Sequence, residues 1–171
     1  KSVTFPYIPG LLAFRELPVL LELWQEVDAV RRRAELIFVD GNGLLHPRRA
    51  GIATCFGVLT ETPTVGVSKS LLLGSVNLSE MQPDERRPIV SGGDVLGMAL
   101  KAKAMSRPIF VSPGHLIDID NAVRLTRLLF HGHRLPEPIY QADAVSRHRG
   151  ALRDDRGAGS NRSTMHNPEK E

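Results

Sequence analysis

The sequence predicts an α/β protein, in which helices flank a sheet that is partly parallel and partly antiparallel. Two observations predict this fold class. Short apolar runs end in polar residues and glycines, as at residues 36–43, which is typical of buried strands. Elsewhere apolar residues recur at helical spacing, as at residues 17–27, and alternation of strands with helices favours an α/β sheet. With 171 residues, 42% of them hydrophobic, the chain has the length and composition of one domain with a buried core.

Charge and apolar content exclude several classes of protein. The chain has 22 Lys and Arg and 19 Asp and Glu. Residues 147–171 hold six of these basic residues and four of the acidic ones, so the rest of the chain is nearly neutral. Net charge therefore does not by itself indicate a nucleic-acid partner. The single Cys55 excludes an intramolecular disulfide, and the chain opens without the apolar region of a signal peptide. No apolar run approaches the ~18 residues of a membrane helix, so we expect a cytoplasmic protein that does not span a membrane.

A first helix is predicted near the N-terminus. Its apolar residues recur every three or four positions, with two glutamates on the opposite side: Leu17, Leu20, Leu21, Trp24 and Val27, against Glu22 and Glu26. Because proline lacks a backbone N–H, Pro18 is expected in the first turn, where that group has no helical partner. Glu16 is then expected at the helix entry.

Two buried strands are predicted next, and each ends in a charged residue. The segment ELIFVDGNG ends its apolar run at Asp40, before two glycines. The segment TPTVGVSK repeats the pattern and ends in Lys69. After a polar, proline-containing stretch at residues 77–93, the segments VLGMALKAK and RPIFVSPGH predict two more strands, paired with each other, the second ending at His115.

Two helices are predicted in the last part of the domain. The first begins at Asp118 or Asp120 as N-cap and stops at Gly132. The second is a short helix within PEPIYQADAVSRHR. From Gly150 onward the chain is rich in Gly, Ser, Asn, Arg and Asp, so we expect a domain at residues 1–149 and a disordered tail at 150–171.

Four ionisable residues lie at the ends of separate predicted elements: Glu16, Asp40, Lys69 and His115. Ligands of open α/β sheets gather outside the carboxyl ends of the strands, so these residues are expected to converge. Two carboxylates, a lysine and a histidine suit metal-assisted phosphoryl transfer. Each also has a structural interpretation: Asp40 as a turn residue, Glu16 as partner of the helix dipole, and the other two as surface residues.

The neighbours of these residues make the pattern specific. PYIPGLLAFRE, DGNGLLHPRRAGIA, GVSK and SPGH resemble the sequence blocks of the endonuclease V family, in order and at fitting separations, within residues 3–147. The resemblance implies an RNase H-like fold and a Mg²⁺ cofactor, with Mn²⁺ as an alternative. It also implies a DNA-repair enzyme that hydrolyses the second phosphodiester bond 3′ to deoxyinosine in DNA, with inosine in RNA as a further substrate.

The resemblance also implies roles for individual residues. Asp40 and Glu16 match metal-binding carboxylates, and Lys69 and His115 match catalytic residues. The strand-separating wedge would be Pro6, Tyr7, Ile8 and Pro9, for which a proline-rich turn is the structural alternative. The pocket for the extruded base would comprise Gly10, Leu12, Gly41, Gly43, His46, Gly51 and Ile52, where close approach of a planar base favours glycine.

The sequence departs from the family pattern at its start. The family has a further metal-binding aspartate on a strand upstream of PYIP, whereas only residues 1–5 precede that block here. We therefore expect an N-terminally truncated domain, from a longer active enzyme. A catalytically impaired fragment that binds nucleic acid is the alternative, and an α/β domain whose strand-end acids are caps is a third and more remote one.

Overall fold

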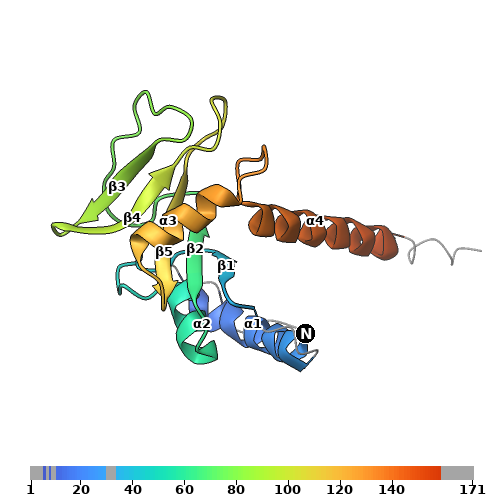
Figure 1. Cartoon of the computed structure of the whole chain (residues 1–171). Coiled ribbons are helices and arrows are strands. Elements are labelled where there is room, and N and C mark those ends of the chain that lie inside the picture. Colours follow the sequence, from blue (N-terminus) through green and yellow to red (C-terminus); the bar gives the residue numbers. More distant parts are fainter. Residues whose placement is uncertain (1–5, 7, 9–10, 30–33, 159–171) are drawn as a thin grey trace, which may run out of the picture.

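The structure of the protein is a computed structural model that describes residues 6, 8, 11–29 and 34–158. Within these residues, helices cover both faces of a five-stranded sheet (Figure 1). The elements in chain order are α1 (Leu12–Ala29), β1 (Ile37–Asp40), α2 (Ile52–Thr60), β2 (Thr64–Ser68), β3 (Arg86–Ser91), β4 (Asp94–Leu100), β5 (Ile109–His115), α3 (Ile119–Leu128) and α4 (Glu137–Ala158).

The sheet is mixed, as the sequence predicted. Its strand order is β1-β2-β5-β4-β3, with β1 parallel to β2 and every other pair antiparallel. Asp40 at the end of β1 pairs with Val67, near the end of β2. The carboxyl ends of β1 and β2 therefore lie at the same edge of the sheet, where the sequence placed two of its candidate residues.

Alternation along β2 divides the core between the two faces of the sheet. Val65 and Val67 face a cluster that includes Val123 of α3 and Ile139 of α4. On the other face, Val39 packs with apolar residues of α2 and α1. The sheet is thus covered on both faces around β1 and β2, and β2 is buried along its whole length.

The first helix differs from its prediction. α1 begins at Leu12, so Pro18 lies inside the helix rather than in its first turn, and Glu16 lies beyond the helix entry. Proline removes the bond to the carbonyl four residues earlier, here that of Phe14. Pro18 and Phe14 both lie on the exposed side of α1, and the helix continues through this position to Ala29.

Two elements were absent from the sequence-based expectations. Residues 86–91, predicted as part of a polar connection, form β3 and pair with β4. Pro88 suggested a connection, but β3 is an edge strand, where a missing N–H costs no ladder bond. Helix α2, immediately after the glycine-rich segment, is the second such element.

The C-terminal helices follow the prediction in part. Asp118 is the N-cap of α3 and accepts a 2.7 Å hydrogen bond from the Asn121 N–H, but the helix ends at Leu128, before Gly132. The predicted short helix is the longer α4, which continues to Ala158. Residues 150–158 are therefore helical where the sequence predicted disorder, and residues 159–171 lie outside the described part of the chain.

The helices that the structure describes include none with the length and apolar character needed to cross a membrane.

Candidate active site

The segment between β1 and α2 packs on the sheet through its backbone. The Gly43 N–H donates a 3.0 Å hydrogen bond to the Ser112 hydroxyl of β5. A Cβ on Gly43 would lie 2.0 Å from the Pro113 carbonyl oxygen, and one on Gly51 would lie 2.1 Å from the Asn42 carbonyl oxygen. Only glycine fits at these two positions, so this loop lies closer to the strands than side chains would permit.

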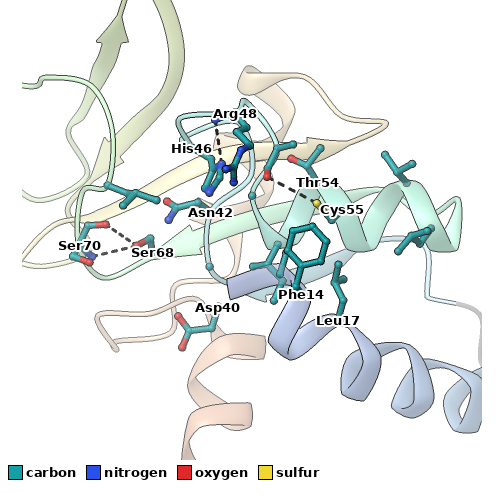
Figure 2. A pocket seen from close by; sticks show the side chains of 18 of the residues that line it. Phe14, Leu17, Asp40, Asn42, His46, Arg48, Thr54, Cys55, Ser68 and Ser70 are labelled. Atoms are coloured by element: carbon teal, nitrogen blue, oxygen red, sulfur yellow. Dashed lines mark hydrogen bonds between the residues drawn. The ribbon is translucent and has the colours of Figure 1, made fainter. Parts of the chain in front are cut away.

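A cavity of about 900 Å³ opens beside this loop (Figure 2). Its walls come from α1, the β1–α2 loop, α2 and residues 68–72. Four of the predicted base-pocket residues line it: Gly41, His46, Gly51 and Ile52. Gly43 instead lies buried beneath the loop, in contact with β5. Gly10 and the side chain of Leu12 lie outside the described part of the structure.

Lys69 joins two carboxylates at the mouth of this cavity. Its Nζ lies 2.9 Å from Asp40 Oδ2, at the end of β1, and 3.7 Å from Asp143 Oδ1, on α4. The other oxygen of Asp143 accepts a 2.6 Å bond from Arg147 one turn later. A cation between two anions at a cavity rim is an arrangement that a phosphate or a metal ion can enter by exchanging partners.

Glu16 belongs to the same electrostatic environment. Partial burial raises the pKa of its carboxyl above the usual 4.5, Arg15 opposes the shift, and the negative charge of Asp40 adds to it. The influence of Asp40 means that α1 brings Glu16 toward the end of β1. Nevertheless, no three His, Cys, Asp or Glu side chains within the described ranges lie close enough together to hold a metal ion.

His115 is not part of this group, and the prediction that it converges with the other three residues is wrong. It pairs with Thr64, at the start of β2, whereas Lys69 follows the end of that strand. The four residue steps from Thr64 to Ser68, the last residue of β2, span about 13 Å. Because β5 runs antiparallel to β2, its carboxyl end lies at the opposite edge of the sheet.

The predicted wedge is described only in part. Pro6 is exposed, and so is Ile8, with 40% of its surface accessible. The Ile8 carbonyl accepts a 2.9 Å bond from the Leu11 N–H just before α1 begins. Tyr7 and Pro9 lie outside the described residues, and the wedge stays a prediction.

Local contacts orient the polar side chains of the loop. The Arg48 N–H donates a 3.2 Å bond to His46 Nδ1, so the neutral imidazole carries its proton on Nε2. His46 is buried and lines the cavity together with Arg48. Arg49, in contrast, points to the β3–β4 turn and pairs with Asp94 at 3.0 Å.

Asp143 is the site residue that sequence reasoning missed. The sequence pattern predicts only that it lies within a short C-terminal helix. A signal was present, because Asp143 follows Ile139 by four residues, the spacing that puts two side chains on one face of a helix. Since Ile139 is buried in the core, the same face carries Asp143 inward, toward Lys69.

A family model described as Endonuclease V matches residues 1–144 of this chain. The chain belongs to the endonuclease V family. The resemblance of its four sequence blocks to that family is therefore confirmed, and so is the α/β fold with a mixed sheet.

Solved structures of endonuclease V share this fold. The catalytic domain of human Endonuclease V, a variant with substituted cysteines, is 40% identical, with a TM-score of 0.81, over 91% of this chain and 68% of that chain. Endonuclease V from Streptomyces avermitilis is 40% identical, with a TM-score of 0.78, over 90% of this chain and 65% of that one. This chain thus spans about two thirds of the length of these relatives.

A third relative is solved with nucleic acid. Ciona intestinalis Endonuclease V, in complex with a 24mer DNA containing an inosine followed by a ribo-adenosine, is 31% identical with a TM-score of 0.77. The match covers 89% of this chain and 70% of the Ciona chain.

Proposed function

We propose that this endonuclease V family member is a magnesium-dependent endonuclease of DNA repair. It would cleave the second phosphodiester bond 3′ to deoxyinosine in DNA, with inosine in RNA as a further substrate, in the cytoplasm. The observation that carries the proposal is Lys69, paired with Asp40 and Asp143 at the rim of a cavity lined by glycines. The Ciona relative, bound to DNA that contains inosine, supports the substrate.

The donor set fits magnesium. Mg²⁺ prefers oxygen ligands, and it commonly takes one or two carboxylates and completes its shell with water and substrate phosphate. Asp40 and Glu16 would hold the ion, and Asp143 is the third nearby carboxylate. Such a site is open rather than an all-protein cage, and Mn²⁺ suits the same oxygens. When bound, the ion supplies charge stabilisation at the scissile phosphate.

The remaining roles follow from charge. The Lys69 ammonium would exchange its carboxylate partner for a phosphate oxygen and offset the charge that develops there. Glu16, as the second carboxylate of the ion, would hold metal-bound water. His115 is assigned no role, since it lies at the opposite edge of the sheet.

The cavity would receive the extruded base. Gly41 and Gly51 lie on its wall, where backbone without side chains offers a flat surface to a planar base. His46 lies on the same wall. Residues 6–9 would fill the space that the base leaves in the duplex, with Tyr7 stacking on its former neighbours.

A cleavage assay tests the proposal. The 171-residue chain is incubated with magnesium and a labelled duplex that carries one deoxyinosine, and a matched duplex carries deoxyadenosine instead. We expect a single cut near inosine and none in the control duplex. Asp40→Ala should abolish the cut, whereas cleavage that persists in this variant would contradict the assignment.

A non-catalytic nucleic-acid binder is the second candidate. The absence of a three-ligand cluster within the described ranges is the observation that favours it. Tight binding of the inosine duplex, with no cleavage that depends on Asp40, would support the binder and refute the enzyme. Equal affinity for the inosine and adenosine duplexes would refute both.

A further inference from the structure

One arginine outside the cavity links three backbone carbonyls next to the candidate site. Arg134 lies shortly before α4, and its Nη2 donates to the carbonyl oxygens of Lys69 and Pro108, each at 3.0 Å. Its Nε donates to the Arg107 carbonyl oxygen, also at 3.0 Å. Three bonds from one planar guanidinium therefore fix the position of Lys69, 65 residues earlier in the chain, relative to residues 107 and 108, which are 27 and 26 residues earlier.

The backbone at Lys69 needs such a partner. The ladder between β2 and β5 ends with the pair Ser68 and Phe110, so the next carbonyl lies beyond the sheet. Ser68 and Ser70 close a tight turn around Lys69, in which the Ser68 hydroxyl donates to the Ser70 carbonyl at 2.6 Å. Arg134 supplies the hydrogen bond that the sheet no longer provides at Lys69.

The same arginine is tied to the helix that carries Asp143. Leu135, its neighbour, is buried in the core together with Ile139, one turn before Asp143. The Glu137 N–H donates a 2.8 Å bond to the Leu129 carbonyl and fixes the start of α4. Arg134 therefore connects the segment that carries Lys69 with the segment that carries Asp143, whose Oδ1 lies 3.7 Å from Lys69 Nζ.

We propose that Arg134 is a positioning residue that holds Lys69 between Asp40 and Asp143. The proposal rests on the proposed nuclease function and adds a residue that does not touch the substrate. A lysine at this position would keep the positive charge but not the fork of donors, so it could not bond all three carbonyls. Arg134→Lys thus separates geometry from charge.

Arg87 offers a matched control. Its Nη1 donates to the carbonyl oxygens of Asn77 and Ser79, at 2.7 and 2.8 Å, far in sequence from the candidate site. Its Nε also donates to Glu85 Oε1 at 2.7 Å, so Arg87→Lys removes a backbone clamp and weakens one ion pair, and it leaves the hydrogen bonds to the Lys69 backbone in place. If the loss of backbone hydrogen bonds were the whole effect, the two variants should therefore have similar unfolding midpoints.

Single-turnover kinetics on the inosine duplex provide the first test. We expect Arg134→Lys to slow cleavage about tenfold to hundredfold, because a displacement of ~1 Å at a reacting group costs on this order. The Kd for the same duplex should change less than about twofold, and Arg87→Lys should retain the wild-type rate. A wild-type rate in folded Arg134→Lys, or a loss of affinity that matches the loss of rate, would overturn the proposal.

A spectroscopic readout keeps this test separate from the proposed function. In ¹⁵N spectra of lysine ammonium groups, the ion-paired Lys69 should give a slowly exchanging signal that Lys69→Arg removes. We expect this signal to broaden or shift in Arg134→Lys and to persist in Arg87→Lys. If the wild-type chain does not cleave, the nuclease proposal fails, and an unchanged Lys69 signal would also overturn the role of Arg134. If circular dichroism shows that Arg134→Lys is unfolded, Arg134→Gln, which keeps two N–H donors, takes its place in both tests.

Discussion

At the scale of single residues, Lys69 illustrates how little a contact contributes to stability and how much it can contribute to function. Its side chain is 38% exposed, and its partner Asp40 is 50% exposed. Ion pairs with this exposure contribute about 0–1 kcal/mol to folding. The pair is therefore better explained by the chemistry of the cavity rim than by the free energy of unfolding.

We expect Lys69→Ala to lower the cleavage rate about 10²- to 10³-fold, as loss of one charge-stabilising group does in other active sites. Its unfolding free energy should fall by no more than about 1 kcal/mol. Lys103→Ala is the control, since the Lys103 ammonium donates to the Gly132 carbonyl and its loss should leave the rate unchanged. Cleavage and urea unfolding measure both quantities, and an unaltered rate in Lys69→Ala would refute the role.

Glu16 predicts a pH dependence of stability. Burial, together with Asp40, raises its pKa in the folded protein above 4.5, so the folded state binds more protons than the unfolded state just above that pH. The contribution of Glu16 to stability is therefore present below pH 4.5 and is lost as pH rises through the folded pKa. Because the wild type loses this contribution as pH rises, the unfolding free energy of Glu16→Gln should increase relative to that of the wild type over the same pH range. Urea unfolding at several pH values measures the difference, which a pH-independent offset would contradict.

At the scale of elements, the β1–α2 loop shows how glycine spacing becomes a cavity wall. Gly43 packs on the backbone of β5, and Gly51 packs on the loop itself. Gly66 of β2 leaves room for this approach, because a Cβ there would lie 2.4 Å from the Gly43 nitrogen. The loop and two strands thus form one unit held by backbone contacts.

Gly43→Ala is expected to destabilise the protein by about 1–3 kcal/mol, since the added methyl meets backbone atoms that have no free volume. It should also displace Gly41 and Asn42 and weaken binding of the inosine duplex. Gly92→Ala is the control: its φ of +63° adds strain, yet nothing lies within 4 Å of the added Cβ. Thermal unfolding and a binding titration compare the two. Unchanged affinity in Gly43→Ala would refute the coupling of loop and pocket.

At the scale of the whole molecule, positive and negative charges nearly balance. Residues 1–146 hold 16 Lys and Arg against 15 Asp and Glu. Such a balance gives little long-range steering of a polyanion. Binding of DNA would then depend on local contacts such as those of Lys69 and Arg48 at the cavity.

A shallow salt dependence follows. We expect the logarithm of the binding constant for the inosine duplex to fall with the logarithm of salt concentration with a slope of about −2 to −4, which corresponds to a few phosphate contacts. Fluorescence anisotropy titrations at salt concentrations from about 50 to about 300 mM measure this slope. A slope beyond about −6 would instead indicate a broad basic surface.

The sequence by itself determined the fold class, the strands that end at Asp40 and Lys69, and the family. These depend on local signals: apolar runs bounded by glycine, helical spacing, and four blocks of fixed residues. Tertiary structure decided the rest, because strand direction and helix contacts join residues distant in the chain. It removed His115 from the candidate site, since β5 runs antiparallel to β2. It added Asp143 and Arg134, since α4 packs on the same core as the strands and brings residues 74 and 65 positions beyond Lys69 to within reach of it.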